Sequence, residues 1–348
     1  MTSYKTLLAA CVLLVACDGN PFLVEETPTD PGTGSGTDPG PGIDSDRVLP
    51  PGTASPSRST GIFRREPTSE NGGSTGDGYV GAVAYDRVTD TFTVDGLAFD
   101  GGNVYQRDNA VGSLGPFAVY EADSTFADDV TGTPIPQFGH RALYGVSRSG
   151  NTEFAIVRTG AYIPFGYGGF VYQRNGSVTL PTSGQASYAG DYAAIRDFDG
   201  AGGLEYAAGD LTISIDFNDF NDGAAVAGQV TNRAIFDVAG NDITDQVVAA
   251  LNVENESALT ALPTLLFSVG PGALDANGEM TGQLGSSVTG ADGAVTAYEA
   301  GNYYAVISGD ATQGGADEVV GIIVVEADDP RSDGVTVRES GGFILYRN

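Results

Sequence analysis

The chain has 348 residues and a formal charge of −29, which comes from 45 acidic and 16 basic side chains. A negative field of that size repels phosphate groups, so nucleic acid is excluded as a partner. Glycine contributes 51 residues, which is high for a soluble protein, and hydrophobic residues make up 41% of the chain. The composition therefore predicts an all-β protein of short strands and tight turns, with enough apolar residues to form a core.

The beginning of the chain resembles a bacterial lipoprotein signal. Lys5 precedes a short apolar run that ends in Leu14-Val15-Ala16-Cys17. The run is too short to span a bilayer as a permanent helix. We expect removal of a signal peptide at residues 1–16 and lipidation of Cys17, including palmitate, which would anchor the chain to the outer membrane of a Gram-negative bacterium, at the cell surface. The alternative is an ordinary secretory signal with a coincidental cysteine. The sequence does not determine which leaflet of the membrane would hold the anchor.

Catalytic residue types are scarce in the expected mature chain. Lys5 is the only lysine, His140 is the only histidine, and both cysteines lie in the first 17 residues. Schiff-base chemistry, a Walker lysine and a histidine metal centre are therefore excluded. His140 follows a loop-like segment, so we expect it at a loop-to-strand junction. There is no G-x-S-x-G elbow to partner it.

Two adjacent carboxylate pairs, Asp317-Glu318 and Asp328-Asp329, are the remaining candidates for acid–base chemistry. Neighbouring residues on a strand point to opposite faces, so neither pair could act on one substrate from both sides of a bond. We therefore expect no enzymatic activity and no cofactor.

Proline is concentrated near the start of the mature chain. Eight of the 17 prolines fall within residues 18–60, among Gly, Thr and Asp and with almost no apolar run. Such a segment cannot bury enough surface to offset the entropy of ordering. We expect residues 17–71 to be a disordered tether, although an unused tail would have the same composition.

Short strand patterns fill the rest of the chain. A period of two or a compact apolar run predicts strands near residues 79–85, 91–95, 117–120, 142–147, 154–158, 169–174, 186–194, 211–217, 225–231, 265–269, 303–308, 319–326 and 342–347. One helix is predicted around Asp245–Asn252, where Val247, Val248 and Leu251 share a face.

An internal repeat organises these strands. Residues 168–175 (GGFVYQRN) match residues 341–348 (GGFILYRN), and two strand patterns precede each copy. We expect two tandem β-domains that meet near residues 175–183, each ending in a three-strand meander. Glycine in the closing strand permits a close approach of another backbone, or a bulge where a curved sheet bends.

The second half resembles the β-barrel domain of transferrin-binding protein B and its relatives, the surface lipoproteins that include factor H-binding protein. The resemblance covers residues 181–348, and residues 72–180 correspond more loosely to the handle domain that precedes such a barrel. The motifs that carry it are GQASYAGDY (184–192), LTISIDF (211–217) followed by VAG (226–228), GNYY (301–304) followed by ADEVVG (316–321), and the closing GGF (341–343).

The resemblance implies an N-terminal handle-like antiparallel β domain, residues 72–180, and a small soluble antiparallel β-barrel of about eight strands, residues 181–348. It also implies a lipid-anchored surface protein that captures a protein or other ligand without catalysis. The relatives have two handle-plus-barrel lobes and transferrin-contacting loops that have no match here, so transferrin is not implied. A membrane-embedded barrel is disfavoured because most strand patterns are shorter than the roughly 9–11 residues that a bilayer requires.

The most aromatic loop-like segment contains Tyr162, Phe165 and Tyr167, which we predict as partner-binding anchors. The alternative is that these rings cap the end of the first domain. The segment 216–223 (DFNDFNDG) has acidic residues but not the register of a calcium loop, so no metal site is predicted. The alternative function is a structural, envelope-stabilising lipoprotein without a specific soluble ligand.

Overall fold

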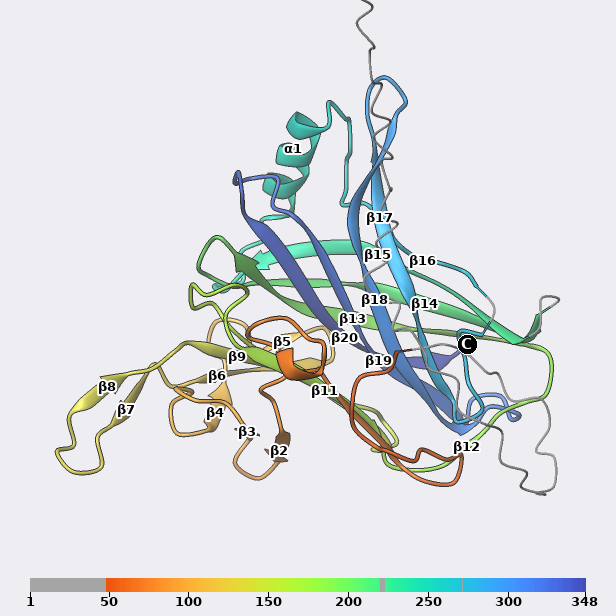
Figure 1. Ribbon diagram of the computed structural model, residues 1–348, viewed down its shortest axis with the longest axis horizontal. Coiled ribbons are helices and arrows are strands. Elements are labelled where there is room, and N and C mark those ends of the chain that lie inside the picture. The colour runs from red at the N-terminus through yellow and green to blue at the C-terminus, as the bar shows by residue number, and fades with distance from the viewer. Residues whose placement is uncertain (1–47, 220–222, 271) are drawn as a thin grey trace, which may run out of the picture. The chain divides into compact units, whose positions relative to one another are not determined.

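The computed structural model describes residues 48–219, 223–270 and 272–348, and most of these residues belong to two antiparallel sheets (Figure 1). The first sheet, which we call the handle, has nine strands and stays open. The second closes into an eight-stranded barrel through pairing of β18 with β19. The predicted fold class is therefore confirmed. The signal peptide and Cys17 lie outside the described residues.

The handle runs in the order β1-β11-β10-β9-β6-β4-β3-β2, with β5 paired to β6. Its strands are β1 (Ile62–Arg65), β2 (Ala82–Asp86), β3 (Thr91–Asp95), β4 (Val104–Arg107), β5 (Ser113–Leu114), β6 (Phe117–Ala122), β9 (His140–Val146), β10 (Thr152–Thr159) and β11 (Gly168–Arg174). A separate hairpin of β7 (Thr125–Ala127) and β8 (Pro134–Pro136) projects from the handle in Figure 1.

The barrel follows in chain order, and helix α1 (Thr244–Glu254) lies between two of its strands, where the sequence predicts a helix. Its strands are β13 (Gln185–Asp199), β14 (Glu205–Asp219), β15 (Gly223–Asp237), β16 (Leu265–Phe267), β17 (Glu279–Thr289), β18 (Val295–Asp310), β19 (Asp317–Asp328) and β20 (Thr336–Arg347). The short β12 (Val178–Thr179) pairs in parallel with β18.

Strand β20 belongs to both halves of the molecule because its side chains alternate between them. Phe343 and Leu345 lie in the apolar interior of the barrel, whereas Ile344 packs in the cluster that the barrel shares with the handle. A Cβ on Gly341 would meet the Tyr192 ring at 2.2 Å, and one on Gly342 would meet the Phe154 ring at 2.1 Å. Gly341 and Gly342 thus admit one ring on each face, where the sequence predicts the approach of a backbone or a bulge.

Strand β10 has a continuous apolar run in its sequence because both of its faces are buried. Phe154 and Ile156 pack against the outer wall of the barrel, and the intervening Ala155 and Val157 pack in a second cluster on the other face of the handle. A strand that is buried on both faces needs apolar residues at every position, so a simple alternation is lost.

Ion pairs cross the same boundary. Arg64 of β1 donates two hydrogen bonds of 2.7 Å to Glu279 of β17. Arg338 of β20 reaches Asp77, which lies just before β2, at 2.5 Å. These side chains are nearly inaccessible to solvent. Burial by itself would lower the pKa of Arg338, but the carboxylates of Asp197, Glu66 and Asp77 raise it overall.

Two expectations are corrected by the fold. The tether was expected to reach residue 71, but β1 begins at Ile62, pairs with β11 and buries Ile62 in the core. The short strand patterns that argued against a membrane barrel were also misleading, because seven of the eight barrel strands have 11 to 16 residues. The barrel interior holds a large apolar cluster together with buried ion pairs that join Arg233 to Glu299 and Glu339. Among the described residues, no helix is long and apolar enough to cross a membrane.

Candidate partner-binding surface

The predicted anchors Tyr162, Phe165 and Tyr167 do not form one exposed surface. Tyr162 is 70% exposed. Phe165 is buried beneath Arg338, whose guanidinium lies 4.4 Å from the ring centre, so this ring caps the handle as the alternative proposed. Tyr167 is half-buried and contacts two other rings.

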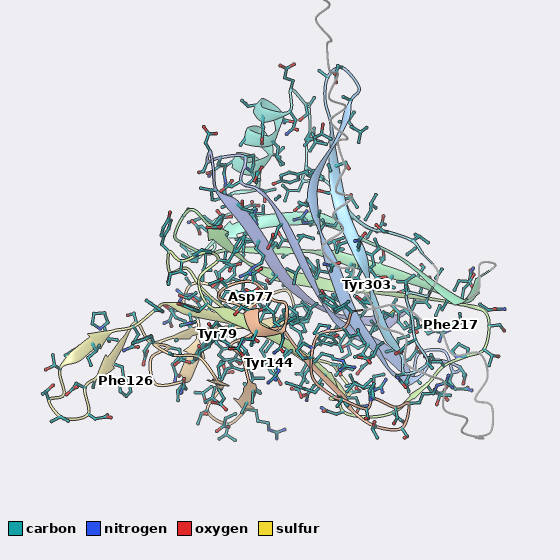
Figure 2. The ribbon with its side chains drawn as sticks, viewed as in Figure 1. Asp77, Tyr79, Phe126, Tyr144, Phe217 and Tyr303 are labelled. Carbon is teal, nitrogen blue, oxygen red and sulfur yellow. The ribbon has the colours of Figure 1, made fainter. Side chains whose placement is uncertain are left out.

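Tyr167 belongs to a row of aromatic side chains on the handle. Its ring centre lies 5.4 Å from that of Tyr79 and 6.3 Å from that of Phe138, and Phe138 lies 5.6 Å from Phe99. The ring of Phe126, on the projecting hairpin, packs over Gly102, where a Cβ would meet it at 2.8 Å. We call Tyr79, Phe99, Phe126, Phe138 and Tyr167 the aromatic patch, and Figure 2 labels Tyr79 and Phe126.

The aromatic patch is only partly shielded from water. Phe99 is 62% exposed, Tyr79 43% and Phe126 41%. Ile135, which is paired with Phe126 across the hairpin, is 42% exposed and extends the apolar surface. Tyr79 and Phe99 keep this exposed area while each contacts another ring, and exposed aromatic side chains of this kind are typical anchors of protein interfaces.

Phe99 holds its exposed position at a conformational cost. Its φ is +60°, a left-handed conformation that is rare for a bulky side chain. The loop is fixed there because the Phe99 carbonyl accepts a 2.9 Å hydrogen bond from the backbone N–H of Phe138. Such strain is retained where the surrounding structure enforces it, and it clusters at functional sites.

The surroundings of the aromatic patch are acidic. Asp123, Asp128 and Asp129 lie on the projecting hairpin, and no lysine or arginine occurs between Arg107 and Arg141. An apolar centre with an anionic rim favours a partner whose contacting surface carries cations.

His140 packs beneath the aromatic patch, beside Phe138. It is fully buried at the start of β9, which confirms the predicted loop-to-strand junction, and its ring centre lies 6.4 Å from that of Phe138. Burial lowers its pKa to about 4, so the imidazole is neutral at pH 7.

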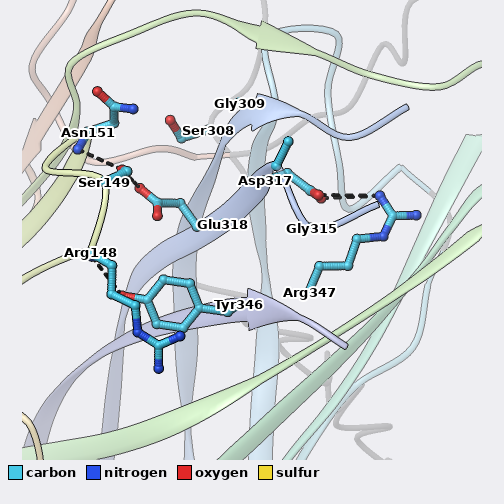
Figure 3. Close-up of a pocket in the computed structure, with 11 residues that line it drawn as sticks. Arg148, Ser149, Asn151, Ser308, Gly309, Gly315, Asp317, Glu318, Tyr346 and Arg347 are labelled. Atoms are coloured by element: carbon cyan, nitrogen blue, oxygen red, sulfur yellow. Dashed lines mark hydrogen bonds and ion pairs between the residues drawn. The ribbon is translucent and has the colours of Figure 1, made fainter. Parts of the chain in front are cut away.

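A polar cavity of about 360 Å³ lies at the junction of handle and barrel (Figure 3). Its polar groups already bond to one another: Ser149 donates a 2.7 Å hydrogen bond to Glu318, and the Arg148 guanidinium stacks 4.3 Å from the Tyr346 ring centre. These contacts tie the β9–β10 turn to β19 and β20. We therefore assign the cavity to the junction. It is lined by Arg148, Ser149, Asn151, Ser308, Gly309, Gly315, Ala316, Asp317, Glu318, Tyr346 and Arg347.

The carboxylate pair in β19 behaves as its spacing predicts. Asp317 accepts a hydrogen bond from Tyr188 of the barrel, whereas Glu318 accepts one from Thr152 of the handle, so the two carboxylates face opposite ways. Within the described part of the chain, no group of three or more His, Cys, Asp or Glu side chains is placed to hold a metal ion. Residues 220–222 of the acidic segment 216–223 lie outside the described residues.

The sequence pointed to Tyr167 but missed the rest of the aromatic patch. The five rings of the patch come from five segments of the chain. Successive rings are 20 or more residues apart in the sequence, except that Phe126 and Phe138 are closer together. The one local signal was an aromatic residue close to a Gly-Gly turn, at Phe99 and residues 101–102.

Comparison with known proteins gives matches in structure but none in sequence. No protein-family model matches the chain, and no curated protein matches it. A solved structure of a double mutant of transferrin-binding protein B from Haemophilus parasuis Hp5 matches over 78% of this chain and 45% of its own, with 11% identity and a TM-score of 0.34. A single mutant of the same protein matches over 76% and 45%, with 12% identity and a TM-score of 0.33.

Intact Ap-TbpB, solved with its N and C lobes, matches over 83% of this chain and 53% of its own, with 13% identity and a TM-score of 0.34. The chain thus spans about half the length of these structures. The handle sheet followed by a closed eight-stranded barrel fits the handle-plus-barrel fold expected from the resemblance.

Proposed function

We propose that this chain is a lipid-anchored, outer-surface binding protein whose handle captures a partner protein through the aromatic patch. The observation that carries the proposal is Phe99, a phenylalanine that is 62% exposed and held at φ +60° in contact with Phe138. A ring held outward in a costly conformation contributes little to folding, and it is positioned for an intermolecular contact.

The partner expected from this surface is a protein with a cationic contact face. The apolar rings would fill its pockets, and the acidic rim would speed association and make it sensitive to salt. The structurally similar proteins from Haemophilus parasuis are named for transferrin binding, and transferrin serves as one defined protein to test. The predicted anchor Tyr162 stays a separate prediction because its ring is exposed outside the aromatic patch.

The location is tested by protease treatment of intact cells that carry either the natural chain or Cys17→Ala. Cleavage of the natural chain on whole cells, and loss of the variant from the cell fraction, are expected for a surface lipoprotein. Protection until the outer membrane is opened would instead favour the envelope-stabilising alternative.

The binding role is tested by comparing proteins retained from the surrounding medium by the natural chain, by Phe99→Ser and by Leu266→Ser. Leu266 is a matched control, because it is 55% exposed and lies on β16 of the barrel. We expect Phe99→Ser to lose the retained protein and Leu266→Ser to keep it. Equal retention by both variants would contradict the assignment of the aromatic patch.

A further inference from the structure

Strand β2 is the uncovered end of the handle sheet. In the barrel, β18 pairs with β19 and closes the sheet, while the short β16 joins β15 and β17 through two residue pairs on each side. At the opposite end of the handle, β1 is covered: Thr53 donates a 2.9 Å hydrogen bond to Phe63, and Arg65 donates one of 3.0 Å to Pro51. In the described sheet order, β2 pairs with β3 and has no strand on its other side.

This edge lacks the usual features that prevent strand addition. Natural edge strands are commonly protected by lysine, proline or a bulge. The sequence of β2 is AVAYD, without lysine or proline, and its pairing with β3 is regular from Ala82 to Asp86. Four of its five residues are exposed, and Val83 is half-buried. A row of backbone donors and acceptors is therefore available to another extended segment.

The side chains around the edge indicate what that segment would contain. Tyr85 is 38% exposed, and its ring centre lies 5.3 Å from that of Tyr144, so alternate residues of an added strand would meet aromatic surface. Asp86 at the end of β2 and Asp95 at the end of β3 are exposed at this edge, beside one basic residue, Arg87. Lysine or arginine at the other alternate positions would match this charge.

We propose that β2 accepts an extended segment of the partner protein, with alternating apolar and basic residues, as an added strand of the handle sheet. A second copy of this chain is a poorer occupant, because each copy carries a formal charge of −29 and Asp86 ends the strand. The proposal rests on the proposed binding role of the handle and assigns to it a mode of recognition in which main-chain hydrogen bonds supply affinity.

The test uses the purified full chain and two synthetic peptides, one alternating lysine with valine and the other alternating glutamate with valine. Backbone hydrogen exchange is followed by mass spectrometry across residues 82–86. We expect the lysine peptide to slow exchange there about tenfold or more, because new hydrogen bonds protect the edge amides. The glutamate peptide should leave exchange unchanged.

Two variants sharpen the test. Ala84→Lys places an edge-protecting cation within β2 and should abolish the protection by the lysine peptide. Ala98→Lys makes the same substitution at an exposed handle position outside β2, and it should retain that protection. Both proteins must first show the circular dichroism spectrum of the natural chain.

The proposal is overturned if the lysine peptide gives no protection at residues 82–86, or if both peptides protect them equally. Protection that appears without peptide and rises with protein concentration would overturn it in favour of a second copy. None of these results changes the retention test of Phe99→Ser, so the failure of strand addition and the failure of the proposed function are distinguishable.

Discussion

The barrel and the handle use the same antiparallel pairing but treat their edges and faces differently. The barrel closes on itself and encloses an apolar cluster together with buried ion pairs. The handle leaves β2 uncovered, packs one face on the barrel, and carries half-exposed rings on its projecting loops. The projecting loops of the handle are thus less buried than the barrel strands, and loops of this kind tolerate variation.

The buried arginines explain how the two regions stay together. Arg338 contacts Asp77 of the handle and Asp197 of the barrel, at 2.5 and 2.8 Å. Removal of one partner of a buried ion pair leaves an uncompensated charge. Removal of the Arg338 side chain is therefore expected to weaken the junction of handle and barrel more than any other change proposed below.

We expect Arg338→Ala to lower the free energy of unfolding by about 3–5 kcal/mol. The loss should come first in the segments around Asp77 and Phe165, because both lose their contact with Arg338. Denaturant unfolding measures the total, and hydrogen exchange locates it. The control Arg87→Ala, at an exposed position, should change stability by less than about 0.5 kcal/mol. Equal effects of the two variants would contradict the role of the buried arginine.

His140 should make the handle sensitive to acid. In the unfolded chain the imidazole takes up a proton near its ordinary pKa of 6.5, whereas in the folded chain burial lowers that pKa to about 4. The unfolded state therefore binds more protons between these values, and stability is lost as the pH falls through this window. The loss approaches about 3 kcal/mol at the acid end.

The measurement is urea unfolding at pH 7 and at pH 4.5 for the natural chain and for His140→Gln. Carboxylates also titrate in this range, so the quantity of interest is the difference between the two proteins. We expect the natural chain to lose more stability on acidification than the variant does. Parallel losses would show that His140 does not contribute.

The repeated glycines offer a direct comparison of the two regions. Gly342 faces the Phe154 ring at the junction, and we expect Gly342→Ala to lower stability by about 1–3 kcal/mol or more through overpacking. The matched position in the first copy is Gly169, where a Cβ would lie 3.1 Å from the Val80 backbone. Gly169→Ala should stay within about 1 kcal/mol of the natural chain, since a small shift relieves the contact and the unfolded chain loses entropy. Equal losses on thermal unfolding would contradict the special role of the junction glycine.

The smallest expected effect on stability is at Phe99. Glycine adopts φ +60° without strain, so Phe99→Gly should leave the free energy of unfolding unchanged or raise it by up to about 1 kcal/mol. The same variant should lose partner binding. A large loss of stability would show instead that Phe99 serves the packing of the handle.

Much of the fold follows from patterns that a sequence displays directly. The apolar runs of β10 and β19, the helix α1, and the Gly-Gly-Phe repeat each arise from neighbours within one strand or one helix. Strand β17 was not predicted, because part of the apolar surface at its glycine positions is supplied by a side chain of the next strand. A Cβ on Gly282 would meet the Tyr303 ring of β18 at 2.6 Å, so a ring of the next strand occupies the space over a glycine.

The candidate binding surface could be predicted only in part. Tyr167 stood out because it lies in a run rich in aromatic residues, but Phe165 in the same run is buried by Arg338, more than 170 residues away. Phe99 and Phe138 meet through a backbone hydrogen bond between two loops. Contacts of this kind depend on the tertiary fold and leave no periodic trace in the sequence.

The sharing of β20 between handle and barrel has a consequence for synthesis of the chain. The handle strands emerge first, yet one of their faces packs on residues of β19 and β20, and Asp77 pairs with Arg338, 261 residues later in the chain. Contacts at this separation form slowly. One face of the handle therefore stays exposed until β20 has been translated, and we expect a chaperone to bind that apolar face during the interval.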